Sequence, residues 1–181
     1  MQAISHTEPS PMRQDMLDRY AEARKTAPAD KPIAVLHIGQ ACTAVATGKC
    51  NEVSVYVLEI GYERISHRFF KQYPPREDAL EHAIFIVEEE VVQLEKLLDG
   101  ETLLYSSDAL VREIAQVAGI SGEPAIMTLD TTERTFDLLV AVVMGRPVSS
   151  SGLPPDSDFA ATLLILREFM HHMRFPAIRV L

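Results

Sequence analysis

Three short apolar runs joined by tight turns constrain the fold of this chain more than any other feature of its sequence. Residues 33–38 (IAVLHI) are almost wholly apolar, residues 43–47 alternate around small side chains, and residues 53–60 (VSVYVLEI) alternate between valine and other residues. Such runs, separated by short turn-forming segments, predict strands. Three consecutive strands with connections this short form an antiparallel meander.

Helical and strand patterns alternate after the meander. The longest helical pattern covers residues 76–98, where apolar residues recur at helical spacing: Leu80, Ala83, Ile84, Val87, Val91, Leu94 and Leu98. The remaining predicted elements are a helix from Pro11 to about residue 26, strands over 102–105, 124–129 and 177–181, and helices over 108–118, about 130–145 and 157–173. A meander followed by this alternation predicts an α/β layered fold with a mixed sheet and flanking helices.

Length, charge and cysteine content restrict the class of function. The chain has 181 residues, enough for one domain or one lobe of a larger fold. Its net charge of −9 argues against nucleic-acid or anionic-membrane partners. No apolar segment reaches the roughly 20 residues of a membrane span, and the first residues lack the apolar core of a signal peptide. Cys42 and Cys50 are expected to be free thiols, and the expected compartment is the cytoplasm.

Four segments in the same order resemble the exopolyphosphatase / guanosine pentaphosphate phosphatase (Ppx/GppA) family of the actin-like ATPase superfamily. IAVLHIGQACTAVATGK is similar to that family's second phosphate-loop hairpin, and VLEIGYERISHRFFKQYPP resembles the segment that follows it. LLYSSDALVREIA stands in the place of a glycine-rich loop, and SSSGLPPDSDFAATLLILREFMHHM resembles the segment before a late helix. The second and fourth segments are the more specific, because glycine-rich loops alone are common.

The resemblance covers roughly residues 33–181 and corresponds to the second half of the family's two-lobed domain. It implies a single ribonuclease H-like lobe of the actin-like type, with residues 1–32 as an N-terminal arm carrying one helix. The family's first lobe, which holds its own phosphate loop and the acid that orients the attacking water, has no counterpart in this chain.

The matched loops depart from the family at the positions that carry chemistry. His37 replaces the hairpin's acid, and only Gly39 remains of a glycine triplet whose other positions hold Gln40 and Ala41. The residues that follow, in place of a Ser/Thr pair, are Cys42 and Thr43. Side chains at positions 40 and 41 narrow a phosphate-binding nest of amides, and a neutral imidazole is a poor substitute for a magnesium-binding carboxylate. The family's glycines in the third segment fall on Ser106 to Ala109 of this chain, and the fourth segment has Ser157 in place of an arginine.

These departures lead to one main expectation and two alternatives. The main expectation is a non-catalytic binding or assembly module without cofactor or metal site, which forms a homodimer through its exposed apolar surface. A separately encoded lobe could instead complete the fold. The other alternative is an active, Mg-dependent phosphatase of polyphosphate or a guanosine polyphosphate, or a weak phosphate or nucleotide binder. The residues at the phosphate-loop positions are the candidate ligand contacts: Gly39, Gln40, Cys42, Thr43, Ser106, Ser107 and Asp108.

Overall fold

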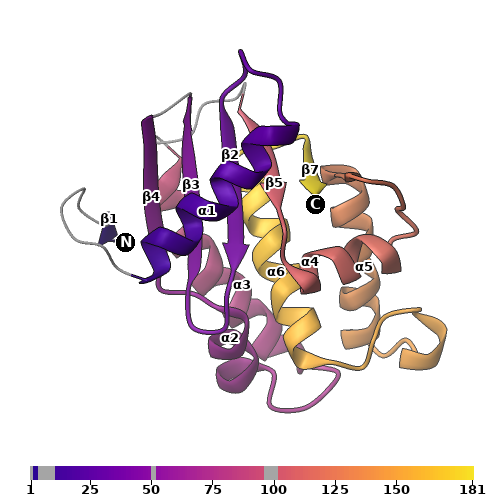
Figure 1. The fold of residues 1–181 in the computed structure, drawn as a ribbon. Coiled ribbons are helices and arrows are strands. Elements are labelled where there is room, and N and C mark those ends of the chain that lie inside the picture. The colour runs from indigo at the N-terminus through magenta and orange to yellow at the C-terminus, as the bar shows by residue number, and fades with distance from the viewer. Residues whose placement is uncertain (1, 4–10, 50–51, 96–101) are drawn as a thin grey trace.

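The computed structural model describes residues 2–3, 11–49, 52–95 and 102–181, which build one mixed sheet with helices around it (Figure 1). The strands lie in the order β1-β4-β3-β2-β5-β7-β6. Their bounds are β1 Gln2–Ala3, β2 Ile33–Ile38, β3 Thr43–Lys49, β4 Glu52–Leu58, β5 Leu103–Ser106, β6 Ala125–Thr128 and β7 Ala177–Val180. The predicted antiparallel meander is confirmed as β2–β3–β4. Strands β5 and β7 run parallel to β2, whereas β6 is antiparallel to β7.

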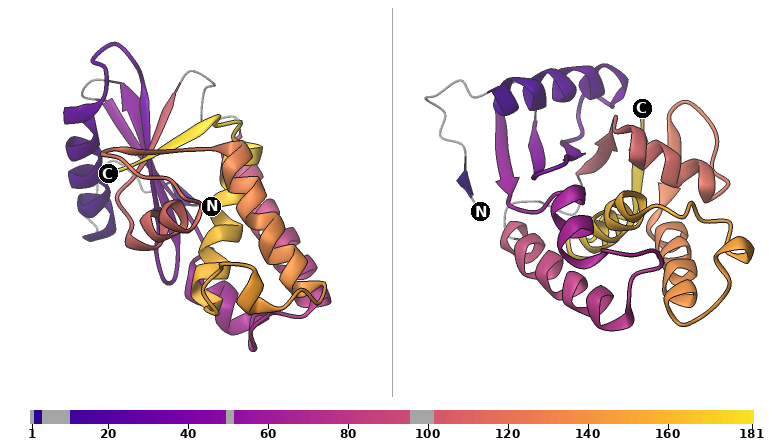
Figure 2. Two further views of the ribbon diagram at one scale, coloured as in Figure 1. Left: turned by 90° about the vertical axis from the view of Figure 1, so that its right-hand side faces the viewer. Right: turned by 90° about the horizontal axis from the view of Figure 1, so that it is seen from below.

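Within the described residues, six α-helices and two short 3₁₀ turns surround the sheet. The helices are α1 Pro11–Thr26, α2 Tyr62–Phe69, α3 Glu77–Val91, α4 Ala109–Val117, α5 Leu129–Val143 and α6 Ser157–His172, and the 3₁₀ turns are Val92–Leu94 and Val148–Ser150. Helix α1 lies along one face of the sheet, over the meander. Helices α3, α5 and α6 lie on the opposite face of the sheet (Figure 2). None of the described helices is both long and apolar enough to cross a membrane.

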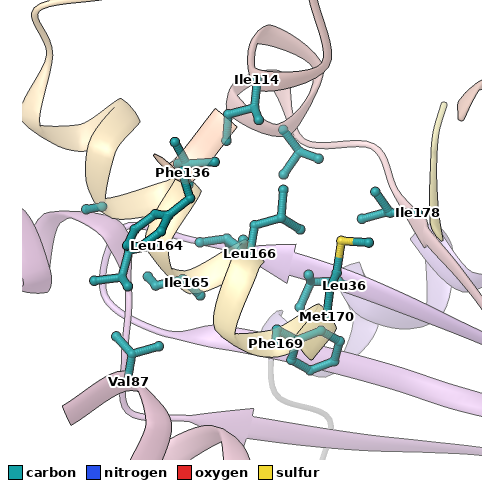
Figure 3. Close-up of a cluster of buried hydrophobic side chains, with 14 of the residues drawn as sticks. Leu36, Val87, Ile114, Phe136, Leu164, Ile165, Leu166, Phe169, Met170 and Ile178 are labelled. Carbon is teal, nitrogen blue, oxygen red and sulfur yellow. The ribbon is translucent and has the colours of Figure 1, made fainter. Parts of the chain in front are cut away.

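The main core forms around α6, whose middle is buried on nearly every side (Figure 3). Leu166 and Phe169 on this helix are fully buried, and the Phe169 ring stacks on Phe175 with 5.8 Å between centroids. Because α6 is covered by the sheet and by α3 and α5, its sequence is apolar all round and does not show one apolar stripe. Of the residues predicted for the apolar stripe of α3, Leu80, Ala83, Val87, Val91 and Leu94 are buried, Ile84 is half-buried, and Leu98 lies outside the described residues.

A second, smaller core lies between α1 and the other face of the meander. Met16, Tyr20 and Ala23 of α1 are buried there, against sheet residues that include Val35 and Ala46. The apolar side of α1 is therefore buried against the sheet of the same chain.

The predicted cap of α5 is wrong by two residues. The sequence suggested a cap within Asp130–Glu133, but α5 begins at Leu129 and its cap is Thr128. The Thr128 hydroxyl accepts the backbone amide of Thr131 at 3.1 Å. The alternation of β6 runs directly into the helix, so the sequence holds no turn residue that marks the boundary.

Candidate functional site

The two loops that hold the predicted site residues lie at the same edge of the sheet. One is the turn between β2 and β3, residues 39–42, and the other follows Ser106 at the end of β5 and leads through Ser107 and Asp108 into α4. Strands β2 and β5 are parallel neighbours, so their carboxyl ends bring both loops together. The separation of 70 residues along the chain is closed by a direct contact between Ile38 and Asp108.

Asp108 is the centre of this contact. Its side chain is 8% exposed, and one carboxylate oxygen accepts the backbone amide of Ile38 at 2.7 Å. The other oxygen lies 2.7 Å from Nδ1 of His37 and 3.0 Å from Nη1 of Arg19. A carboxylate only accepts hydrogen bonds, so this pairing places the His37 proton on Nδ1. Asp108 is also the cap residue of α4, yet its side chain makes no hydrogen bond to that helix.

Arg19 of α1 is a member of the site that the sequence did not reveal. Its Nη1 donates to the hydroxyl of Ser107 and to Asp108, both at 3.0 Å, while its Nε donates to Asp15 at 2.7 Å. Arg19 lies 89 residues before Asp108 on an element expected to be an arm, so no spacing pattern linked the two. The contact fixes α1 to the edge where the loops meet.

The turn between β2 and β3 is closed on itself and on α2. The amide of Gly39 donates to the carbonyl of Cys42 at 3.0 Å. The carbonyls of Gly39 and Gln40 accept the first amides of α2, from Tyr62 and Glu63, at 3.0 and 3.1 Å. These amides would otherwise be the unsatisfied donors of a helix start, which can bind an anion. The Gln40 side chain adds a hydrogen bond to Glu63 at 2.8 Å.

Gly61 permits this close approach of α2 to the turn. A Cβ atom at position 61 would lie 2.3 Å from the carbonyl oxygen of Gln40 and 2.6 Å from the amide nitrogen of Cys42. No side chain fits in such a space, so the packing of α2 against the turn requires glycine at position 61, in the second family-like segment. That segment also contacts the fourth one, because Ser66 donates to Asp158 and the Ser157 hydroxyl donates to the carbonyl of Phe70.

The remaining predicted ligand residues lie in different environments. Ser106 is fully buried; its hydroxyl accepts the amide of Asp108 at 3.2 Å, and its carbonyl accepts the amide of Leu181 at 2.9 Å. Thr43 is also fully buried, and its hydroxyl has no hydrogen-bond partner in the part of the chain that the structure describes. Cys42 is a half-buried free thiol whose pKa is raised by burial, an effect that the Arg64 charge partly offsets. Cys50 lies outside the described residues.

The residues present do not fit a magnesium ion at this edge. Both oxygens of Asp108 already accept hydrogen bonds from the protein, and His37 is a poor ligand for a hard cation. Within the described ranges, no three His, Cys, Asp or Glu side chains are grouped so that they could hold a metal.

Two hollows flank the site, and neither contains Asp108. An open one of about 410 Å³ lies outside the β2–β3 turn and is lined by Gln40, Ala41, Glu63, Arg64, His67 and Arg68. A larger one of about 790 Å³ lies between α1, α4 and the loop before β6. None of the predicted ligand residues lines this larger hollow, so size alone does not mark the site.

Comparison with known proteins gives matches at the level of structure. No protein-family model matches the sequence, and neither does any curated protein. The fold is similar to a Ppx/GppA family member from Aquifex aeolicus, with a TM-score of 0.72, 16% identity, and coverage of 95% of this chain and 58% of that one. It is also similar to an exopolyphosphatase from Cytophaga hutchinsonii (TM-score 0.64, 20% identity, 83% and 53% coverage). An exopolyphosphatase-like protein matches with a TM-score of 0.63, 13% identity, and coverage of 98% and 59%.

The chain therefore has the fold of one lobe of the actin-like Ppx/GppA architecture and spans a little over half the length of these structures. This confirms the expected fold class, a mixed sheet with an antiparallel meander and flanking helices. Coverage of 95% or more extends beyond residues 33–181, so the structural similarity includes part of the N-terminal segment.

Proposed function

We propose that this protein is a non-catalytic relative of the Ppx/GppA phosphatases that acts as a binding or assembly module. Two observations support the relationship: the shared fold of one lobe and the order of the four family-like segments in the sequence. The absence of catalysis is inferred from the contacts at the edge where the two loops meet.

The observation that carries the proposal is the position of the Asp108 carboxylate. It accepts the Ile38 amide and the Arg19 guanidinium and contacts Nδ1 of His37, all within 3.0 Å. Backbone amides and arginines are the groups that bind phosphate oxygens in proteins. An internal carboxylate thus takes the donors that a phosphate would need, and its negative charge repels a second anion.

The assembly role follows from the length of the chain relative to its structural neighbours. A chain that matches a little over half of those proteins has the fold of one lobe of a two-lobed architecture. We propose a homodimer as the form in which the protein works, with a separately encoded lobe as the other possible partner.

The test is calorimetric titration of the protein, in the presence of magnesium, with polyphosphate and separately with guanosine tetraphosphate. Phosphate release is followed in parallel. We expect neither heat of binding nor release of phosphate from the unmodified protein. We expect Asp108→Ala to gain weak binding without turnover, because the substitution frees the Ile38 amide and Arg19. Phosphate release by the unmodified protein would overturn the proposal.

One observation favours the alternative, an active phosphatase or phosphate binder. Among the described residues, the buried hydroxyl of Thr43 has no hydrogen-bond partner, although it follows directly on the turn at this edge. Under this alternative Asp108→Ala would abolish phosphate release, whereas under our proposal there is no release to lose.

A further inference from the structure

The two edges of the sheet differ in how they end. At one edge, β1 pairs with two residues of β4, Gln2 with Val57 and Ala3 with Tyr56. At the other edge, β6 is the last strand, and no described strand pairs with its outer side. Charged residues are one of the devices with which natural sheets protect such an edge. Strand β6 reads Ala-Ile-Met-Thr and carries no charged residue.

The hydrogen bond between Leu129 and Pro176 determines which groups of β6 point outward. The Leu129 amide donates to the Pro176 carbonyl at 2.9 Å, at the end of the ladder between β6 and β7. The N–H and C=O groups alternate between the two sides along an antiparallel strand. Residues 125, 127 and 129 thus face β7, while Ile126 and Thr128 direct their backbone groups away from the sheet.

Only some of the outward groups are available for another strand. The Thr128 carbonyl already accepts the hydroxyl of Thr132 at 3.0 Å, in the first turn of α5. Pro124, two residues before Ile126, has a carbonyl but no N–H. The groups without a partner among the described residues are the N–H and C=O of Ile126, the N–H of Thr128 and the C=O of Pro124.

We propose that β6 is the dimer interface of this protein, and that it pairs antiparallel with β6 of a second copy about a twofold axis at Ile126. This inference rests on the proposed assembly role and names the surface that performs it. In this register, Ile126 of one copy exchanges both backbone hydrogen bonds with Ile126 of the other. The Thr128 N–H of each copy donates to the Pro124 carbonyl of the other.

In this register each of these N–H donors lies opposite one of these C=O acceptors of the second copy, and no donor faces another donor. Pro124, which cannot donate, lies opposite Thr128 of the second copy, whose carbonyl is already engaged by Thr132. A pairing about a twofold axis requires one segment to be complementary to itself. The segment from Pro124 to Thr128 meets this condition for hydrogen bonding, which a partner of unrelated sequence need not do.

The side chains support the same pairing. Ile126 is 49% exposed and lies on the opposite face of the sheet from Ala125 and Met127, which belong to the main core. It shares that face with Arg179, its neighbour on β7. Residues directly opposite in an antiparallel pair lie on one face, so the two Ile126 side chains would contact each other across the axis and leave water.

Sedimentation of the full chain over a concentration series tests the interface. We expect the unmodified protein to dimerise and Ile126→Lys to be monomeric, because two like charges would then face each other at the axis. Met144→Lys is the matched control, since Met144 is 63% exposed on another part of the surface, and it should dimerise normally. A monomeric unmodified protein, or an Ile126→Lys variant that still dimerises, would overturn the proposal.

Cross-linking tests the register separately. In a background with Cys42 and Cys50 replaced by serine, Ile126→Cys should form an intermolecular disulfide on oxidation, because opposed Cα atoms lie about 5.5 Å apart. The exposed Glu123→Cys should not, because its two copies would be offset by about six residues, roughly 20 Å. Equal cross-linking of both variants would contradict the register. Neither experiment depends on phosphate binding, so this interface and the absence of catalysis can fail independently.

Discussion

The carboxylate of Asp108 accepts the backbone amide of Ile38 at 2.7 Å, across the ends of two parallel strands. With Arg19 and His37 on its second oxygen, it joins the meander, the β5–α4 loop and helix α1 at one point. The edge where the two loops meet is thus occupied by the protein's own negative charge. The same contacts hold these elements together, so we expect their loss to lower the free energy of unfolding.

Asp108→Asn should lower the free energy of unfolding by about 1–3 kcal/mol, because the amide replaces a charged acceptor that serves buried donors. Urea denaturation measures the change. Asp130→Asn is the control: Asp130 pairs with Arg134 on the surface, where both side chains are mostly exposed. It should cost about 0.5 kcal/mol or less. Equal effects of the two substitutions would mean that the Asp108 contacts add nothing to stability.

Gly61→Ala should destabilise the protein by about 1–3 kcal/mol, because the added methyl meets the Gln40 carbonyl and pushes α2 from the turn. Hydrogen exchange provides the specific measurement, since the amides of Tyr62 and Glu63 should exchange faster. Gly119→Ala is the control, with a left-handed φ of +77° but nothing within 4 Å of the new methyl. It should leave those two amides unchanged.

Phe169→Ala should cost about 3–5 kcal/mol, because it removes a fully buried ring and leaves a cavity beside Phe175. Phe85→Ala makes the same chemical change on α3, where the ring is 55% exposed, and should cost less than about 1 kcal/mol. Thermal and urea unfolding of the pair measure the difference. Similar losses would show that α6 does not centre the core.

Cys42 should react slowly with alkylating agents at neutral pH, because burial raises the pKa of its thiol and only the thiolate reacts. Its rate should keep increasing with pH beyond the range in which an ordinary cysteine has reached its plateau. Arg64→Gln should slow the reaction further, since the Arg64 charge lowers this pKa. Mass spectrometry of the Cys42 peptide separates it from Cys50. A faster reaction in the variant would contradict the assigned role of Arg64.

The sequence was sufficient for most of the elements and for the fold class, because local patterns carry that information, but β1 and α2 are not among the predicted elements and α3 ends at Val91, before the predicted end. Strand β2 was predicted with its observed ends, Ile33 and Ile38. The positions of α4 and α6 were predicted within two residues, since cap residues and apolar periodicity mark them. No local pattern predicts that β7 lies between β5 and β6 in the sheet, because this position depends on strand pairing between residues far apart in the sequence.

The candidate site was only partly accessible from the sequence, for a similar reason. Both loops could be identified from their composition, and parallel strands bring them together. The ion pair of Arg19 with Asp108 joins residues 89 positions apart and follows no motif. His37 is paired with Asp108, and the identity of that partner could not be read from spacing.

The unequal edges of the sheet determine how far association can proceed. Pairing of β6 with its own copy consumes the open edge of both molecules, because the contact is the same on each side. In the proposed dimer, the edge strand of each molecule is therefore covered by the other copy, and neither copy keeps a free β6 edge for a third molecule.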